Sequence, residues 1–299
     1  MIPETLQQLL PLLPEIPAAS VSEVRLSALS RIYISIYKLI VVNDLDDELG
    51  NRIRYERMID ALFERGWACY SRLKHFEIRG RLLHTLFSLT FEPGTVADEH
   101  RAAACIRAAD TLVREYLATL RTTRKGADPE GQADVMRCAA DLAFPGRNDR
   151  PAYRILYRER LTAWAAALRA DGSWPGLSRN DALRRIGLMN RDSYMFPEGG
   201  YEPEARRAFA HYVRKSDFPD RPEPAGWPEI CELGLLYEIL VQGNLWRVDE
   251  ELVGQVVAQL WNYVTRHRGS DDDAWVYSLS ILVQHACEKY GETLQRGIV

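Results

Sequence analysis

Residues 26–42 read LSALSRIYISIYKLIVV, a stretch in which Arg31 and Lys38 are the charged side chains. Residues 230–241 (ICELGLLYEILV) and 275–283 (WVYSLSILV) have the same character. A helix that is apolar on nearly all sides is buried on all sides. Strand-like alternation of apolar and polar residues is almost absent from the chain. These segments therefore predict an all-α fold with buried helices at its centre.

A second kind of segment carries a charged face beside one apolar stripe. Residues 52–65 (RIRYERMIDALFER) and 151–169 (PAYRILYRERLTAWAAALR) are examples. Such a stripe is typical of a helix that lies at the surface and packs one side inward. The two kinds alternate along the chain, so we expect each buried helix to pair with an outer helix in a hairpin.

Helical periodicity, interrupted by short loops rich in Gly, Pro, Asp and Asn, defines about twelve helices. The predicted spans are residues 3–12, 21–42, 48–67, 70–91, 97–124, 130–144, 151–170, 179–195, 202–215, 228–242, 248–268 and 273–291. The buried helices recur at intervals of about 50 residues, which is typical of a helical-hairpin repeat. Their starts lie near Arg25, Gly80, Gln132, Asn180, Glu229 and Asp273.

Six such hairpins allow a closed ring, an open solenoid or an irregular helical bundle. We expect a closed ring, in one domain over residues 1–299, because no polar capping hairpin is visible at either end. The segment 216–226 (SDFPDRPEPAG) contains three prolines, and we interpret it as a loop between hairpins.

Charge and composition exclude several classes of partner. The formal net charge is −4, from 38 basic and 42 acidic residues whose signs are interspersed, so nucleic acid is not an expected partner. Pro11 and Pro14 break the N-terminal apolar stretch, which argues against a signal peptide. We see no apolar run of about 20 residues that would span a bilayer. We therefore expect a cytoplasmic protein without a membrane span.

A short motif, Asp171-Gly172-Ser173-Trp174, follows an outer helix and precedes a buried one. Asp and Gly favour a tight turn, and the Trp ring is suited to packing between neighbouring hairpins. Here the chain resembles the α/α-toroid superfamilies, which include squalene and diterpene cyclases, toroidal polysaccharide lyases and glycoside hydrolases. The resemblance implies a closed α/α toroid of about six helical hairpins, and Trp174 is expected to be a packing residue.

A second motif, Asp44-Leu45-Asp46-Asp47, resembles the Asp-x-Asp-Asp acid of class II terpene cyclases. Clustered carboxylates cannot all ionise, so one of them stays protonated and can act as a general acid. The resemblance implies that Asp44, Asp46 and Asp47 are catalytic and protonate an isoprenoid in an apolar cavity. In those cyclases the acid opens a buried helix, whereas here it follows the end of one. The alternative is a solvated loop that caps the next helix.

The starts of the buried helices would meet at one mouth of a toroid. Carboxylates there give an alternative site, and aromatic and basic neighbours would bind substrate: Asp134, Asp181, Glu232 and Asp273, with Arg79, Trp227, Trp275 and Tyr277. Carboxylates beside aromatic platforms suit sugar binding and hydrolysis. The alternative for each acid is helix capping, because acidic residues favour helix N-termini.

Metal and cofactor sites are not indicated. The five cysteines are an odd number in mostly apolar helical context, which indicates buried free thiols. Lanthipeptide cyclases share the toroid and bind zinc through cysteines and a histidine. The chain lacks their adjacent Cys-His pair, and His285 and Cys287 face apart on a helix. We therefore expect no metal and no cofactor.

Three functions fit these observations. The first is a class II terpene cyclase-like enzyme, whose carbocations would be stabilised by aromatic side chains on the buried helices. The second is a toroidal carbohydrate lyase or glycoside hydrolase at the polar mouth. The third is a non-catalytic helical scaffold that binds a peptide or protein. For an enzyme, the expected partner is a small-molecule isoprenoid or sugar.

Overall fold

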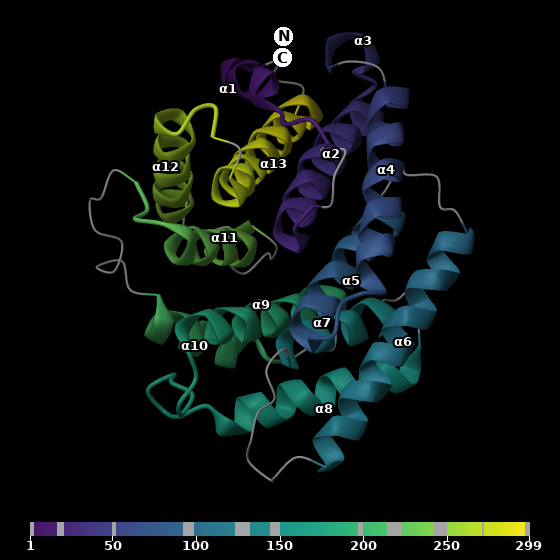
Figure 1. Ribbon diagram of the computed structural model, residues 1–299. Helices are drawn as coiled ribbons and strands as arrows, with labels where there is room; N and C mark the ends of the chain where they lie inside the picture. Colours follow the sequence, from purple (N-terminus) through teal and green to yellow (C-terminus); the bar gives the residue numbers. More distant parts are fainter. Residues whose placement is uncertain are drawn as a thin grey trace. The chain divides into compact units, whose positions relative to one another are not determined.

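The computed structural model describes residues 3–16, 21–49, 52–91, 99–122, 132–143, 150–196, 200–213, 223–241, 250–270 and 272–296. The secondary structure within these ranges is helical throughout and contains no strand, which confirms the all-α prediction. The helices, labelled in Figure 1, are α1 (Glu4–Leu9), η1 (Leu10–Leu12), α2 (Glu23–Asn43), α3 (Asp46–Leu49), α4 (Arg52–Tyr70), α5 (Phe76–Phe91), α6 (Glu99–Thr122), α7 (Gln132–Ala143), α8 (Pro151–Ala167), α9 (Arg179–Met195), α10 (Glu202–Tyr212), α11 (Trp227–Val241), α12 (Glu250–Arg266) and α13 (Asp273–Gln295).

The predicted spans agree with these helices to within about four residues, except after α2 and at α5, which was expected to begin at residue 70 but begins at Phe76 because α4 extends to Tyr70. A single helix was expected over residues 48–67, whereas the chain forms the short α3 before α4. Asp44 adopts a left-handed conformation with φ of 54° and closes α2, and the Leu45 N–H donates to Ile40 O at 3.1 Å. An aspartate tolerates this conformation, which ends the helix and redirects the chain.

The chain divides into two compact units, which are described separately below. The first comprises residues 1–74, 81–105 and 260–299, and the second comprises residues 75–80 and 106–259. Three helices, α5, α6 and α12, contribute residues to both units.

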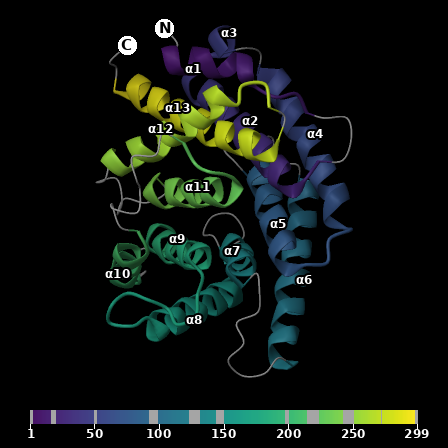
Figure 2. The ribbon, with the colours of Figure 1, turned by 60° about the vertical axis from the view of Figure 1, so that its left-hand side comes forward.

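In the first unit, the earliest long helix packs against the last one. Helices α2 and α13 lie side by side, although more than 200 residues separate them in the sequence, and both ribbon views show this pairing (Figures 1 and 2). Helix α4 packs on α2, and α1 packs on α13. Both α2 and α13 are largely buried, as the apolar segments 26–42 and 275–283 predicted.

Helix α2 lies in the core, and two of its tyrosine hydroxyl groups form hydrogen bonds. The Tyr33 hydroxyl donates to the carbonyl of Pro14 at 2.6 Å, and the Tyr37 hydroxyl donates to Glu56 at 2.8 Å. Within the described residues, α2 is also the one helix whose length and composition would allow it to cross a membrane, contrary to the sequence expectation. Its most apolar stretch is 61% buried inside the chain, as expected for the core of a helical protein.

In the second unit, α7 packs against α8, and α9 packs against both α10 and α11. The turn between α8 and α9 contains the motif at residues 171–174. Gly172 has φ of +85°, and a Cβ there would lie 2.4 Å from Arg207 O, so glycine is required. Asp171 Oδ1 accepts hydrogen bonds from the Ser173 N–H at 2.9 Å and the Ser173 hydroxyl at 2.7 Å.

Trp174 is a packing residue, as predicted from the motif. Its side chain is 4% exposed, and its indole N–H donates to Trp164 O at 2.7 Å. Its ring stacks on Tyr212 of α10 with centroids 6.0 Å apart, and the Arg185 guanidinium of α9 lies 5.8 Å from it. The Trp164 indole N–H in turn donates to Gln132 at the start of α7 at 2.8 Å. The Trp174 ring therefore packs between two hairpins. The hydrogen bond from Trp164 to Gln132 connects this contact to the start of α7.

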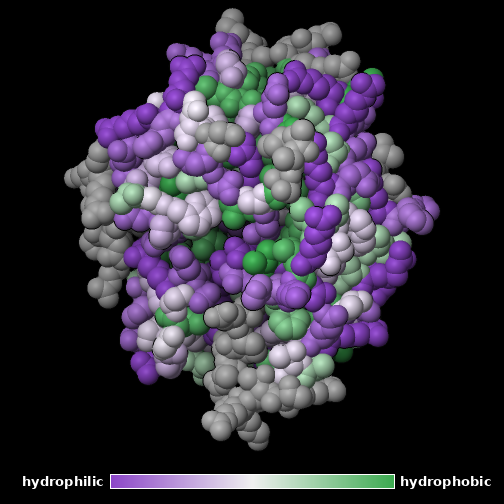
Figure 3. All heavy atoms as spheres, viewed as in Figure 1, coloured by the Kyte–Doolittle hydropathy of each residue, from purple (hydrophilic) through white to green (hydrophobic). Residues whose placement is uncertain are grey.

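The surface is mixed in polarity. On the face drawn in Figure 3, described hydrophobic residues appear as small areas among hydrophilic ones. Exposed large hydrophobic side chains are scattered over four helices: Val42, Ile53, Ile155 and Trp227. Single residues of this kind are normal on a soluble domain.

Candidate functional site

Three carboxylates from three helix starts surround one guanidinium in the second unit. Arg184 Nη1 lies 3.1 Å from Glu77 Oε1, 3.7 Å from Asp134 Oδ2 and 3.6 Å from Asp181 Oδ1. Glu77 belongs to the first turn of α5, Asp134 to that of α7 and Asp181 to that of α9. We call these four residues the Arg184 cluster.

Local structure explains why the acids lie there. Carboxylates are favourable at helix N-termini, where backbone N–H groups lack partners inside the helix. Ser178 caps α9 by accepting from the Asp181 N–H at 3.2 Å, and its hydroxyl donates to Asp181 Oδ2 at 2.6 Å. Gly80 allows α5 and α7 to approach closely, because a Cβ there would lie 2.8 Å from the carbonyl carbon of Asp134.

The cluster is partly removed from water. The side chains of Asp134 and Arg184 are 6% and 23% exposed, whereas that of Asp181 is 50% exposed. Burial lowers the pKa of Arg184, but the neighbouring Asp134, Glu77 and Asp181 outweigh it and raise the pKa overall. The guanidinium therefore stays charged and holds the carboxylates near one another.

Further charged and aromatic groups lie at the neighbouring helix starts of the second unit. Arg179 at the start of α9 pairs with Glu232 of α11 at 2.8 Å. Trp227, the first residue of α11, is 37% exposed. Arg79 of α5 pairs with Glu115 of α6 at 2.6 Å.

Two of the carboxylates predicted for the mouth, Asp134 and Asp181, contact the same guanidinium, whereas Glu232 pairs with Arg179. Their role at a mouth stays a prediction. Glu77 and Arg184 were missed. Arg184 follows Asp181 by three residues, and this helical spacing was the available signal for the ion pair.

The remaining residues predicted for the mouth, Asp273, Trp275 and Tyr277, lie in the first unit. Asp273 accepts a hydrogen bond from Ser22 Oγ at 2.5 Å. Trp275 is 5% exposed and donates its indole N–H to Val264 O at 3.0 Å, so burial contradicts a substrate-binding role. Tyr277 lies beneath the Arg31 guanidinium, 5.3 Å from its ring centroid.

Asp44 and Asp46 do not provide the buried acid that the cyclase resemblance implies. Asp44 and Asp46 are exposed, and the side chain of Asp47 lies outside the described residues. Asp46 Oδ1 accepts from the Arg52 N–H at 2.9 Å, which supports the start of α4. The implied burial is wrong for Asp44 and Asp46, because α2 ends at the surface, and the catalytic role of the motif stays a prediction. The alternative of a solvated loop agrees with the exposure of both residues, and Asp46 supports the next helix.

A different carboxyl group is fully buried. The side chain of Asp192 in α9 has no exposed area, and its nearest cation in the described chain is Arg158, whose Nε lies 3.8 Å from Oδ1. Neither carboxyl oxygen has a hydrogen-bond partner there. Burial raises the pKa of Asp192 to about 6, although Arg158 and Arg154 oppose this shift. The guanidiniums of Arg154 and Arg158 both lie over the Phe196 ring, 4.6 and 5.6 Å from its centroid.

The described residues contain no group of three or more His, Cys, Asp and Glu side chains placed to hold a metal ion. The five cysteines are free, and Cys105, Cys138 and Cys287 are buried as predicted. Burial raises the pKa of the Cys105 thiol to about 11 and that of Cys138 well above its ordinary value. These three thiols are therefore protonated, inert parts of the core.

Comparisons with protein-family models, curated proteins and solved structures find no match to this chain.

Proposed function

We propose that the hairpins close into an α/α toroid. The packing of α2 against α13 supports closure, because the first and last buried helices are neighbours in a ring and far apart in an open solenoid. The packing of α1 on α13 supports it as well, since the first helix then provides the outer partner of the last buried one. In the second unit, α9 contacts both α7 and α11, which is the neighbour order of successive buried helices.

We further propose that the chain is a glycoside hydrolase-like enzyme acting at the Arg184 cluster. The observation that carries this proposal is the spacing of two carboxyl groups on different helices. Glu77 Oε1 and Asp134 Oδ2 lie 3.1 and 3.7 Å from the same nitrogen of Arg184. The two oxygens are therefore at most about 7 Å apart, an upper limit that overlaps the roughly 5–9.5 Å range of carboxyl pairs in glycosidases.

The proposed chemistry needs only these side chains and water. One carboxyl group donates its proton to the glycosidic oxygen as the bond to the anomeric carbon breaks. The other carboxylate removes a proton from the attacking water, or attacks first and is released by water. Arg184 would fix the positions of both groups, and the exposed Trp227 ring would provide a platform for a sugar at the same helix starts.

The local charge indicates which sugars would bind. Within the four residues of the Arg184 cluster, three carboxylates share one guanidinium, so acid exceeds base in the cluster itself. A polyuronate would be repelled by this excess, whereas neutral or amino sugars would not. We therefore favour hydrolysis over the polysaccharide-lyase alternative. The free cysteines fit a reducing, cytoplasmic location for such an enzyme, which is part of this proposal.

The test is an assay of the full chain against neutral, amino and uronic-acid oligosaccharides, with release of new reducing ends as the readout. We expect turnover of a neutral or amino sugar. Glu77→Gln and Asp134→Asn should each lower kcat/KM by roughly 100-fold or more, as expected for loss of an acid–base group. Glu202→Gln, which removes an exposed carboxylate from α10, is the matched control and should retain activity.

Two outcomes would overturn the proposal: no reducing ends from any sugar in the panel, or full activity in both carboxamide variants. Unsaturated products from a uronate would favour the lyase alternative. Glu77→Gln is the safer variant, because that side chain is 31% exposed while Asp134 is 6% exposed.

The class II cyclase is a second candidate, and it needs an acid other than Asp44 or Asp46. Asp192 is the observation in its favour, because its buried carboxyl group has a pKa of about 6. Its O–H would protonate an alkene or epoxide and leave a carbocation on the substrate. Two guanidiniums already cover the nearby Phe196 ring, which would otherwise stabilise that cation, so this candidate ranks second. It predicts cyclised products from linear isoprenoids that Asp192→Asn abolishes, and it fails if the parent forms none.

A further inference from the structure

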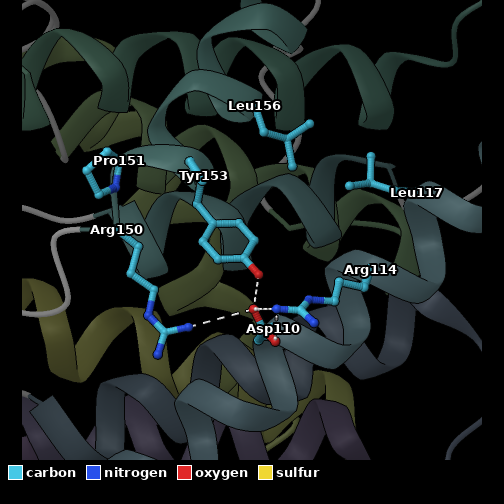
Figure 4. Close-up of a pocket in the computed structure, with 8 residues that line it drawn as sticks. Asp110, Arg114, Leu117, Arg150, Pro151, Tyr153 and Leu156 are labelled. Carbon is cyan, nitrogen blue, oxygen red and sulfur yellow. Dashed lines mark hydrogen bonds and ion pairs between the residues drawn. The ribbon is translucent and has the colours of Figure 1, made fainter.

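A separate cavity of about 520 Å³ lies between α6 and the beginning of α8, within the second unit. Leu117 and Leu156 lie near each other on one side of it, and Pro151 adds apolar lining beside Arg150 (Figure 4). Helix α8 begins where α7 ends, because the Arg150 N–H donates to Leu142 O at 3.2 Å. The cavity is therefore at the opposite end of α7 from Asp134 and is distinct from the Arg184 cluster.

The polar part of the cavity is organised around one carboxylate. Asp110 accepts a hydrogen bond from the Tyr153 hydroxyl and forms ion pairs with Arg114 at 3.1 Å and Arg150 at 3.7 Å. All three donors converge on Asp110 in Figure 4. Among the described residues that line the cavity, two guanidiniums thus face one carboxylate, an excess of one positive charge.

The guanidiniums are accessible to an incoming molecule. The side chains of Arg114 and Arg150 are 74% and 45% exposed, whereas Asp110 is 20% exposed. A guanidinium carries five N–H donors in a planar fork, so binding one carboxylate oxygen leaves donors for a second anion.

The start of α8 adds to the positive potential. Its N-cap, Arg150, forms no side-chain capping bond, and its first turn contains no acidic residue. The N-terminus of a 17-residue helix carries partial positive charge that favours an anion. Unlike the starts of α5, α7 and α9, this helix start has no carboxylate of its own in the first turn.

We propose that this cavity binds a small organic anion, in which a phosphate or carboxylate head group pairs with Arg114 and Arg150 while an apolar body contacts Leu117 and Leu156. Asp110 acts as an internal competitor: it holds both guanidiniums and Tyr153 in place, and it lowers affinity because it offers the same charge as the ligand. The site is independent of the proposed hydrolase function.

The experiment is titration calorimetry of the full chain with phenyl phosphate, benzoate and inorganic phosphate, with benzyl alcohol as an uncharged probe. We expect phenyl phosphate or benzoate to bind more tightly than inorganic phosphate, and benzyl alcohol not to bind. Arg114→Gln and Arg150→Gln should each weaken binding by about tenfold, the loss of one charge-assisted contact. Asp110→Asn should strengthen it, because the competing charge is gone.

The control is Arg169→Gln, which removes an exposed arginine just beyond the far end of α8 and should leave affinity unchanged. Melting curves establish that each variant is folded; if Asp110→Asn is not, the two arginine variants decide. The proposal is overturned if none of the anions binds, if Arg169→Gln weakens binding as much as Arg114→Gln, or if folded Asp110→Asn binds less tightly than the parent. Loss of sugar hydrolysis in Glu77→Gln would not affect any of these results.

Discussion

The two ends of α7 in the second unit present opposite charge arrangements. At its start, one arginine, Arg184, is shared by three carboxylates. Beyond its end, one carboxylate, Asp110, is shared by two arginines and a tyrosine hydroxyl. The ratio of carboxylates to guanidiniums is therefore reversed between the two sites. The exposure of the side chains differs as well: Asp134 and Arg184 are largely buried, whereas Arg114 and Arg150 extend into water.

This difference shows how similar ion pairs acquire different roles. A buried pair fixes geometry, and removing one partner leaves an uncompensated charge. An exposed pair contributes little to stability and is available for exchange with a ligand. We therefore expect substitutions in the Arg184 cluster to change folding stability, and substitutions around Asp110 to change ligand affinity. The predictions below test this contrast.

The largest effect should come from Trp174, which supports the Arg184 end of the unit. Trp174→Ala removes a ring that is 4% exposed and is hydrogen-bonded to Trp164 O, so it should lower the free energy of unfolding by about 3–5 kcal/mol. Urea unfolding measures this change. Trp227→Ala is the matched control, because that ring is 37% exposed and should change stability by less than about 1 kcal/mol. Equal effects in the two variants would contradict the structural role of Trp174.

Trp174 also illustrates what the sequence could predict. Turn chemistry and helical periodicity are local, so the Asp171–Trp174 turn and the apolar helices were correctly identified from a few residues each. The burial of a carboxylate is not local, because it depends on what packs against it. Asp46 and Asp134 both lie at helix starts, yet Asp46 is exposed and Asp134 is buried by the close approach of α5 at Gly80.

A second substitution addresses the cluster itself. Arg184→Met removes the cation that pairs with the buried Asp134, and breaking a buried pair typically costs 3–5 kcal/mol. Because Glu77 and Asp181 are partly solvated, we expect the lower end, about 3 kcal/mol, in urea unfolding near neutral pH. Arg206→Met, which breaks an exposed pair with Glu202, should cost under about 1 kcal/mol. If the two variants were equally stable, the cluster would be no more than a surface network.

Asp192 extends the contrast to a buried carboxyl group whose oxygens accept no hydrogen bond in the described chain, although Arg158 lies 3.8 Å away. Its folded-state pKa of about 6 exceeds the unfolded value of 3.8, so ionising it in the folded protein is unfavourable. The penalty is complete above about pH 6 and vanishes as the pH falls toward about 4, because both states are then protonated. At about 1.4 kcal/mol per pKa unit, its size is at most about 3 kcal/mol.

Asp192→Asn should therefore be more stable than the parent near pH 7, and this advantage should shrink as the pH is lowered to about 4. The measurement is urea unfolding of both proteins across that range. Glu159→Gln, which removes an exposed carboxylate from α8, should follow the parent at every pH. A constant difference between Asp192→Asn and the parent at all pH values would mean that Asp192 does not titrate in this window.

The Asp110 cavity could not be predicted from the sequence, because it too depends on packing between segments that are far apart in the chain. Asp110 and Arg114 are four residues apart on α6, which is a recognisable helical pair. Tyr153, however, is 43 residues from Asp110, and only the packing of α8 on this part of α6 brings its hydroxyl to the same carboxylate. The sequence therefore indicated the Asp110–Arg114 ion pair, but it did not indicate the cavity beside that pair.

The smallest effect should be that of Arg114→Gln on stability. The guanidinium is 74% exposed and remains solvated when Asp110 is not bound to it, so the melting temperature should not change measurably. The same substitution should nevertheless weaken phenyl phosphate binding by about tenfold, because that contact is charge-assisted. Arg184→Met should behave in the opposite way, with a lower melting temperature and unchanged anion binding in the fraction that is folded. If Arg114→Gln lowered the melting temperature as strongly as Arg184→Met, the pairs around Asp110 would be structural, and both ends of α7 would have the same role. Calorimetric binding and thermal melting on the same two preparations decide between these outcomes, because a structural pair affects melting and a ligand-binding pair affects affinity.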